Sequence, residues 1–255
     1  MSVPPSSSPL LVIVGPTASG KTGLAVRLCE ESGGEVVSAD SVQVYRHVTI
    51  GSGKPSAEEL ARAPHHLLDV VEPDQPMDAA VWAELARRTV EEIRARGRVP
   101  IVCGGTFLYV RALLWGLAPA PPADEAVRAA HRALVEREGR AALHRLLEQR
   151  DPESARRLAP NDFVRVSRAL EVLEVSGVTM SQWQARHGFR DRQYDFRLVG
   201  LAQGREELEQ RIAARVELML AAGWEQEVRD LLARGWGDTR PLGAVGYKQM
   251  KAFIE

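Results

Sequence analysis

The fold is decided by one stretch near the start of the chain, Gly15-Pro16-Thr17-Ala18-Ser19-Gly20-Lys21-Thr22. It matches the phosphate-binding pattern G-x-x-x-x-G-K-[ST] at every defined position. The apolar run 10–14 before it is typical of a buried parallel strand, and apolar residues at helical spacing follow over 22–31. A strand, a glycine-rich turn and a helix in this order direct successive backbone N–H groups at one anion. We therefore predict an α/β fold, with a P-loop parallel sheet flanked by helices.

The residue types of this loop predict what it binds. Gly15 and Gly20 let the backbone curl around the anion, and Lys21 adds a mobile positive charge. The hydroxyl of Thr22 suits a Mg²⁺ ion that bridges two phosphates. We therefore predict that residues 15–22 bind a diphosphate or nucleotide, with Thr22 as the metal ligand. The alternative, a turn that only joins a strand to a helix, is disfavoured because both flanking segments fit and the chain has only four lysines.

The composition is that of an ordinary globular protein. The 255 residues are 45% hydrophobic and 26% charged, enough for one large domain or a main domain with an insertion. Because the net charge is only −1, a nucleic-acid partner must be bound by local patches. Residues 1–9 are rich in Ser and Pro and are predicted to be disordered, and the next apolar run is too short for a signal peptide or a membrane span. With Cys29 and Cys103 as expected buried thiols, these features predict a cytoplasmic enzyme without a membrane association.

A second strand is predicted over 35–40, and it ends in the carboxylate of Asp40. In an open parallel sheet, ligands bind outside the carboxyl ends of the strands, so Asp40 should face the same cleft as Lys21. Asp40 is also a suitable cap for the turn that follows, and both roles are compatible. A further strand over 99–103 runs into Gly104-Gly105-Thr106 without a terminal aspartate, which counts against an ATP hydrolase.

The segments between these strands predict local structure. Ser56 and Glu59 have capping-box spacing, and a helix over 79–96 should bury Val81, Leu85, Val90 and Ile93. A helix is also expected over 107–115. Lys54 is either a solvated lysine or a contact to phosphate or RNA. His65 and His66 precede the apolar run 67–71, and we expect them to have a structural role because neighbours on a strand face opposite sides.

A helical insertion is predicted in the middle of the chain. The Pro-rich stretch 117–123 is a boundary, and strand character returns over 197–201. We therefore divide the chain into a catalytic core, 10–120 and 195–255, and an insertion, 121–194. Helices are expected over 124–138, 141–150, 152–158, 162–176 and 181–187. Residues 124–194 contain thirteen arginines and no lysine, and Arg165 and Arg168 share one helix side as the best candidate RNA-binding face. Taken in isolation, this pattern favours solvated arginines beside the apolar stripe of Val166, Leu170 and Leu173.

The segment after the insertion predicts two more helices. The first carries an apolar stripe of Leu208, Ile212, Val216 and Met219, with Arg211 and Arg215 on an adjoining face. The second is expected over 225–234.

The order of these motifs resembles that of the tRNA dimethylallyltransferases, which attach a prenyl group to the adenosine next to the anticodon. The matching stretches are 15–22, 40–45, 50–55, 64–69, 104–106, 160–162, 165–171 and 245–247. The resemblance implies dimethylallyl diphosphate as donor, Mg²⁺ as cofactor, a helical insertion that grips the anticodon stem-loop, and a target base flipped into a channel. A monomer is expected.

The resemblance also implies roles for individual residues. Asp40 would be the base that takes the amine proton, Thr106 would position the adenine, and Arg215 would be a second diphosphate ligand. The tRNA contacts would come from Asp40, Ser41, Val42, Gln43, Thr106, Arg128, Val164, Arg165, Val166, Ser167, Arg168, Gly243, Ala244, Val245, Gly246, Tyr247 and Lys248.

Three departures from the family pattern are visible. Ser52-Gly53 stands where the family usually has Thr-Ala, and Gly243-Ala244 replaces a usual basic pair. The family also continues with a basic helical stretch beyond the position of Glu255, so we expect a fragment or a short variant. The alternatives that remain are an isopentenyltransferase for free adenine nucleotides, a small-molecule P-loop kinase, and a non-catalytic RNA-binding module.

Overall fold

The computed structural model describes residues 8–255, so most of the segment predicted to be disordered, residues 1–7, lies outside the described residues. The described chain forms two compact units. One combines the residues up to Gly116 with Arg192–Glu255, and the other is Leu117–Asp191. Among the described helices, none is both long and apolar enough to cross a membrane.

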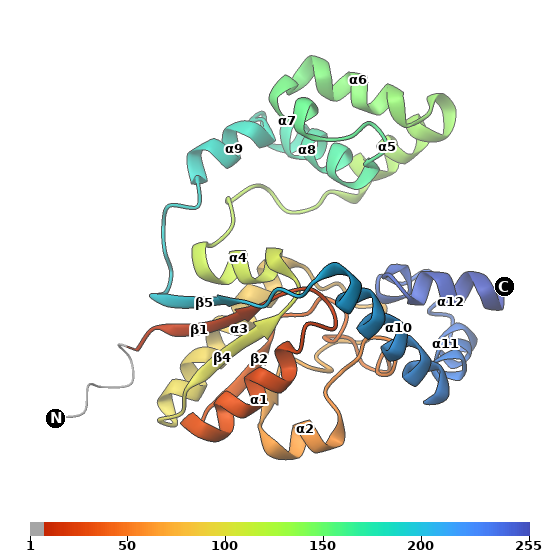
Figure 1. Cartoon of the computed structure of the whole chain (residues 1–255). Helices are drawn as coiled ribbons and strands as arrows, with labels where there is room; N and C mark the ends of the chain where they lie inside the picture. The colour runs from red at the N-terminus through yellow and green to blue at the C-terminus, as the bar shows by residue number, and fades with distance from the viewer. Residues whose placement is uncertain (1–7) are drawn as a thin grey trace. The chain divides into compact units, whose positions relative to one another are not determined.

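The first unit is built on a five-stranded parallel sheet with helices on its two faces (Figure 1). The strand order is β3-β2-β4-β1-β5. The strands are β1 (Leu10–Val14), β2 (Glu35–Ser38), β3 (His65–His66), β4 (Pro100–Gly104) and β5 (Phe196–Gly200). The flanking helices include α1 (Lys21–Ser32), α3 (Ala79–Ala95) and α4 (Phe107–Trp115), which has the predicted bounds. The predicted α/β fold with a parallel sheet is confirmed.

The core of this unit follows from its apolar strands. Ile13 of β1 is fully buried against Ala25 and Val26 of α1. Cys29 and Cys103 are buried free thiols, as expected. At the end of β4, a Cβ on Gly104 would lie 2.1 Å from the carbonyl oxygen of Ala39, so only glycine allows β2 and β4 to approach so closely here. This close approach brings the loops after the two strands together.

The packing between the strands agrees with the sequence patterns only in part. His65 and His66 form the strand after α2 (Ala57–Arg62), as expected for neighbours on a strand, and the run 67–71 bends where Leu67 and Asp69 adopt φ of 62° and 53°. On α3, Val81 is 46% exposed, whereas Trp82 is buried and its indole N–H donates to the carbonyl oxygen of Ser38. Val90 and Ile93 are buried as predicted, so the prediction fails at the first turn of α3 and holds in its C-terminal half. On α10 (Arg205–Ala221), no residue of the apolar stripe is buried.

The remaining helices of this unit are formed by the last residues of the chain. They are α11 (Trp224–Ala233), the short 3₁₀ helix η2 (Pro241–Gly243) and α12 (Tyr247–Ile254). The predicted capping box of α2 is present, with Ser56 and Glu59 each accepting from the other's backbone N–H.

The second unit is entirely helical over its described elements. It contains α5 (Glu125–Glu138), α6 (Arg140–Arg150), α7 (Pro152–Arg157), α8 (Phe163–Ser176) and α9 (Met180–His187). Leu143 and Leu147 of α6 pack on Val166, Ala169 and Leu170 of α8 to form its core. Asp124, Asp151, Asp162 and Thr179 cap the helices α5, α7, α8 and α9 with their side chains.

Candidate functional site

The loop between β1 and α1 has the geometry that its sequence predicts. Gly20 caps α1 with φ of 88°, a conformation that disfavours any residue with a Cβ. At Gly15, a Cβ would lie 2.8 Å from the carbonyl oxygen of Leu201 and 2.9 Å from the hydroxyl of Ser19. Both glycines are therefore required for the curl of the loop at the helix N-terminus, where free N–H groups attract anions.

Lys21 and Ser19 leave polar groups available in this loop. The ammonium of Lys21 donates to the carbonyl oxygen of Pro16 at 2.6 Å. Burial lowers the pKa of Lys21, while the nearby Cys103 and Asp40 oppose this shift and Arg215 adds to it. The buried hydroxyl of Ser19 has no hydrogen-bond partner among the described residues. A phosphate oxygen or a metal-bound oxygen would satisfy it.

A cleft of about 880 Å³ opens beside the loop. Its walls are residues 18–23, the loop 49–57 and the side of α10 that carries Arg211 and Arg215. Arg215 donates to the carbonyl oxygen of Gly53 at 3.1 Å. Gly53 has φ of 59°, and a Cβ there would lie 1.5 Å from Nη2 of Arg215. The glycine that departs from the family pattern therefore makes room for this arginine.

Asp40 and Thr106 occupy the neighbouring carboxyl ends of β2 and β4. The Oδ1 atom of Asp40 accepts from the backbone N–H groups of Val42 at 2.8 Å and Gln43 at 3.1 Å, so the expected cap of the turn is present. The hydroxyl of Thr106 accepts from the N–H of Ser41 at 2.9 Å. Thr106 begins α4 without a side-chain cap because its hydroxyl is used in this contact. The arrangement leaves the second carboxylate oxygen of Asp40 free of these turn contacts.

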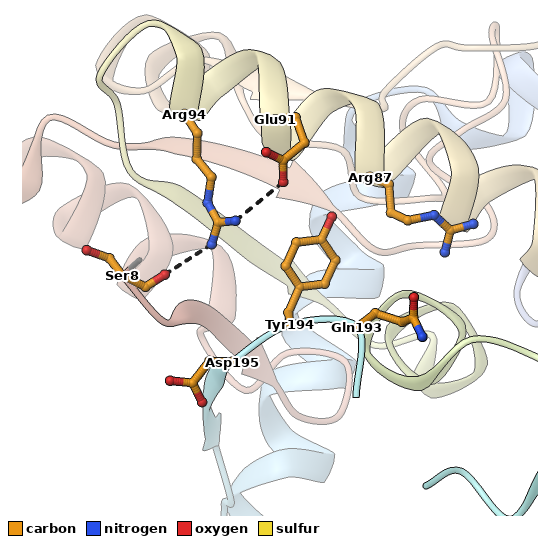
Figure 2. A pocket seen from close by; sticks show the side chains of 7 residues that line it. All are labelled: Ser8, Arg87, Glu91, Arg94, Gln193, Tyr194 and Asp195. Atoms are coloured by element: carbon orange, nitrogen blue, oxygen red, sulfur yellow. Dashed lines mark hydrogen bonds and ion pairs between the residues drawn. The ribbon is translucent and has the colours of Figure 1, made fainter. Parts of the chain in front are cut away.

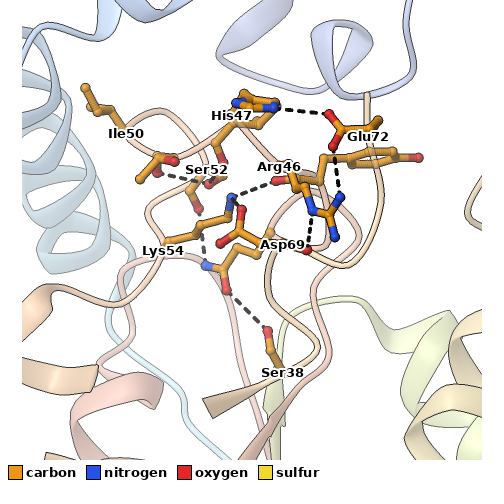
Figure 3. A network of polar contacts seen from close by, with 12 residues as sticks. Ser38, Arg46, His47, Ile50, Ser52, Lys54, Asp69 and Glu72 are labelled. Carbon is orange, nitrogen blue, oxygen red and sulfur yellow. Dashed lines mark hydrogen bonds and ion pairs between the residues drawn. The ribbon is translucent and has the colours of Figure 1, made fainter. Parts of the chain in front are cut away.

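A polar network supports the wall of the cleft (Figure 3). The amide of Gln43 accepts from Ser38 and donates to the carbonyl oxygens of Ser52 and Gly53. The side chain of Lys54 is 5% exposed and its ammonium contacts Asp69 at 2.7 Å, so the interpretation of Lys54 as a solvated lysine is wrong. Sequence reasoning missed the role of Gln43 in holding this wall, because its partners are nine and ten residues away in an irregular loop.

In the helical unit, a buried carboxylate organises two of the predicted tRNA-binding arginines. Glu171 is fully buried and accepts from Arg128 at 2.9 Å and Arg168 at 2.6 Å, as well as from the N–H of Asp124. Burial acts to raise the pKa of Glu171, but the hydrogen bonds from Arg168 and Arg128 outweigh it and lower that pKa. These arginines therefore have a structural role inside their unit.

Of the other residues on α8 that were predicted to contact tRNA, two are exposed and two are buried. Val164 is 75% exposed, and the side chain of Arg165 is 71% exposed and paired with Asp162. Val166 and Ser167 are buried and the Ser167 hydroxyl bonds to His131, so their side chains are not accessible to tRNA. Only part of the predicted face is therefore accessible.

The predicted C-terminal tRNA contacts divide in the same way. Val245 is 92% exposed, and Gly243 and Lys248 are exposed. Ala244 and Gly246 are half-buried. A side-chain contact from Tyr247 to tRNA is wrong, because its ring is fully buried and its hydroxyl donates to Glu227 at 2.5 Å. No local pattern in the sequence identified Glu227.

A second cavity of about 360 Å³ lies at the opposite ends of the strands (Figure 2). Arg94 spans it, donating to the carbonyl oxygen of Ser8 at 3.0 Å and to Glu91 at 3.3 Å. Asp195 lines it and pairs with the first residue of β1, whereas the phosphate-type loop follows the last residue of β1. This cavity is therefore separate from the cleft beside Lys21.

Comparison with known proteins identifies the family of the chain. The family model described as IPP transferase matches residues 43–255. The chain belongs to the IPP transferase family. A curated relative, the tRNA dimethylallyltransferase of Sorangium cellulosum, is 60% identical over 99% of this chain and 80% of its own length. That of Geobacter sulfurreducens is 48% identical over 98% and 80%. The alignment with the Sorangium cellulosum relative extends over 252 of the 255 residues and so includes the P-loop, which lies before the residues that the family model matches.

Solved structures of this family have the same fold. The tRNA isopentenylpyrophosphate transferase of Bacillus halodurans is 38% identical with a TM-score of 0.66, over 96% of this chain and 77% of that one. A eukaryotic dimethylallyltransferase acting on tRNA is 26% identical with a TM-score of 0.78, over 97% of this chain and 63% of that one. Members of the IPP transferase family act on diphosphate substrates, which agrees with the anion-binding geometry of residues 15–22.

Proposed function

We propose that this chain transfers a dimethylallyl group from dimethylallyl diphosphate to tRNA. The acceptor is the exocyclic amine of the adenosine on the 3′ side of the anticodon, in tRNAs that read codons beginning with U. The observation that carries the proposal is the phosphate-type loop beside the cleft: Lys21 lies within electrostatic reach of Asp40, and the two follow the parallel strands β1 and β2, which flank β4, in a member of the IPP transferase family.

The loop 15–22 and Arg215 supply the groups that receive the leaving diphosphate, and Asp40 supplies the base. The amine nitrogen forms a bond to the first carbon of the prenyl chain as the bond from that carbon to the diphosphate oxygen breaks. The backbone N–H groups of the loop, Lys21 and Arg215 stabilise the negative charge that develops on the leaving diphosphate. The free carboxylate oxygen of Asp40 takes the amine proton, and Thr106 holds the loop that carries Asp40.

Mg²⁺ fits this donor set as a cofactor. No group of three metal-ligating His, Cys, Asp or Glu side chains exists within residues 8–255, so a cage made by the protein alone is not available. Mg²⁺ commonly takes one or two protein oxygens and completes its shell with substrate phosphates and water. The Thr22 hydroxyl would hold it, and the unpartnered Ser19 hydroxyl lies in the same loop. Bound there, Mg²⁺ would neutralise charge on the diphosphate.

The anticodon stem-loop is the proposed macromolecular substrate, and the enzyme is proposed to act as a monomer in the cytoplasm. The exposed residues among the predicted contacts are Val164 and Arg165 on the helical unit, and Gly243, Val245 and Lys248 on the catalytic unit. Flipping an adenosine out of a single-stranded loop costs less than flipping it out of a duplex.

Transfer of labelled prenyl groups tests this function. The protein, dimethylallyl diphosphate and Mg²⁺ are incubated with tRNA, with AMP, or with neither, and Lys21→Ala is run in parallel. We expect label in tRNA and a loss of about a hundredfold or more in rate for the variant. Label only in AMP would assign the activity to free nucleotides. A parallel reaction with labelled ATP and a filter-binding assay with tRNA complete the test: transfer of the terminal phosphate of ATP to a small molecule would assign a kinase, and tRNA binding without prenyl transfer would assign a binding module.

A further inference from the structure

The turn over residues 49–51 is held from a distant part of the chain. The carboxylate of Glu227 on α11 accepts from three successive backbone N–H groups, those of Thr49 at 2.9 Å, Ile50 at 2.7 Å and Gly51 at 3.3 Å. Its fourth donor is the hydroxyl of Tyr247 on α12, at 2.5 Å. Within the described residues Glu227 makes no ion pair with lysine or arginine, so these four donors are the protein groups that bind its carboxylate.

The turn also fits the surface of α11 and α12 closely. A Cβ on Gly51 would lie 2.0 Å from the indole nitrogen of Trp224 and 2.7 Å from Cζ of Tyr247. Both aromatic side chains are buried, and their rings meet edge to face at 5.8 Å. Burial and the hydrogen bond to Glu227 raise the pKa of Tyr247, so its hydroxyl remains a donor at physiological pH. Glycine at position 51 and the carboxylate of Glu227 together lock the turn in one position.

This turn leads directly into the wall of the cleft. The N–H of Gly53 donates to the carbonyl oxygen of Ile50 at 2.9 Å, which closes the turn on itself. The carbonyl oxygen of Gly53 then accepts from Arg215, and Ile50, Gly53 and Lys54 line the cleft beside Lys21. A movement of the turn would therefore move the point at which Arg215 is anchored.

We propose that Glu227 is a positioning residue for the diphosphate site, with Tyr247 as its supporting donor. It holds the turn 49–51 so that Gly53 can place Arg215 over the cleft. The kinetic part of this inference rests on the proposed function. Within the segment Val245-Gly246-Tyr247, Tyr247 then supports the diphosphate site by its hydrogen bond to Glu227, and only the exposed residues of the segment are available to tRNA.

Three variants and a matched control test this inference. Glu227→Ala removes all four acceptor contacts, Glu227→Gln keeps an oxygen but loses the charge, and Tyr247→Phe removes one donor. The control is Glu225→Gln on the same helix, whose side chain is 45% exposed and paired with Arg229. The readouts are amide hydrogen exchange at residues 49–53, calorimetric binding of inorganic pyrophosphate with Mg²⁺, the KM for dimethylallyl diphosphate, kcat, and the melting temperature.

We expect amide hydrogen exchange at residues 49–51 to be fastest in Glu227→Ala and moderately faster than in the wild type in Glu227→Gln and Tyr247→Phe. The exchange rates of α1 should not change. The KM for the donor should rise by roughly ten- to a hundredfold in Glu227→Ala, since small errors in placement have effects of this size. The value of kcat should change less, and the control should match the wild type. If Glu227→Ala does not fold, the two milder variants still decide the question.

Two results would overturn the inference. One is unchanged pyrophosphate affinity and unchanged exchange in Glu227→Gln and Tyr247→Phe. The other is a lower melting temperature with wild-type KM, which would make the contact purely structural. If the wild type transfers no prenyl group at all, the proposed function fails, but the pyrophosphate and exchange measurements still test the role of Glu227.

Discussion

The phosphate-loop unit and the inserted helical unit use their charged groups differently. In the first, Lys21 and Asp40 bond to backbone groups of their own loops, and Ser19 has no partner among the described residues. In the second, Arg128 and Arg168 are both bound to the buried Glu171. The polar groups of the loop in the first unit can therefore bind a ligand, whereas these two arginines of the second unit stabilise its fold. Substitutions should affect chemistry in the first unit and stability in the second.

The largest expected effect is on the rate of transfer when Asp40 is changed. Asp40→Ala should lower kcat by roughly a hundred- to ten-thousandfold with tRNA binding retained, the usual range for loss of a general base. Asp40→Asn separates the two roles of this residue, because its amide oxygen can still accept from Val42 and Gln43 but its basicity is lost. A near-normal rate in Asp40→Asn would show that Asp40 only caps the turn. Single-turnover kinetics with labelled donor measure both variants.

The matching test in the helical unit is Glu171→Ala. Removing this buried carboxylate leaves Arg128 and Arg168 without their partner, which should cost about 2–4 kcal/mol of unfolding free energy, a value reduced because both guanidinium groups are partly exposed. The control is Glu138→Ala, whose side chain is 49% exposed and pairs with Arg137 on the surface. Chemical denaturation measures both. Equal stability of the two variants would contradict the structural role of Glu171.

A smaller effect on the same unit should appear at acidic pH. Because the pKa of Glu171 is lowered below its ordinary value of 4.5, its contribution to stability is complete above that value and is lost as the pH falls through the folded-state pKa. The unfolding free energy should therefore decrease between about pH 5 and pH 3, and this decrease should be smaller in Glu171→Gln. Thermal melts across this range measure it. An identical pH dependence in the variant would exclude Glu171 as a source.

The smallest expected effect is at Arg165. Arg165→Ala should weaken tRNA binding several-fold and reduce the slope of log affinity against log salt by about 1, the change expected for one lost phosphate contact. Arg137→Ala is the matched control, since its side chain is 67% exposed and also paired with a carboxylate. Filter binding at several salt concentrations measures both. If the two variants behave alike, α8 does not present the RNA-binding face.

The sequence alone determined the P-loop, its flanking strand and helix, the helix over 107–115 and the capping box at Ser56. These features are encoded by contiguous residues: glycine permits the left-handed conformation at Gly20, and a Ser/Glu pair three positions apart caps a helix. The order of the motifs also carried the family resemblance, because it depends on spacing along the chain.

Only the tertiary structure decided which residues support the cleft and which are buried. Glu227 binds the N–H of Thr49 across 178 positions, and Arg215 binds Gly53 across 162. Periodicity predicted that Val81 is buried, but Trp82 is the buried residue at that turn of α3. On α8, Arg168 binds the buried Glu171, whereas Arg165 is exposed and pairs with Asp162. The physical reason is that burial and long-range contacts depend on how the elements pack against one another. A pattern within one segment contains no information about the surface that another segment brings to it.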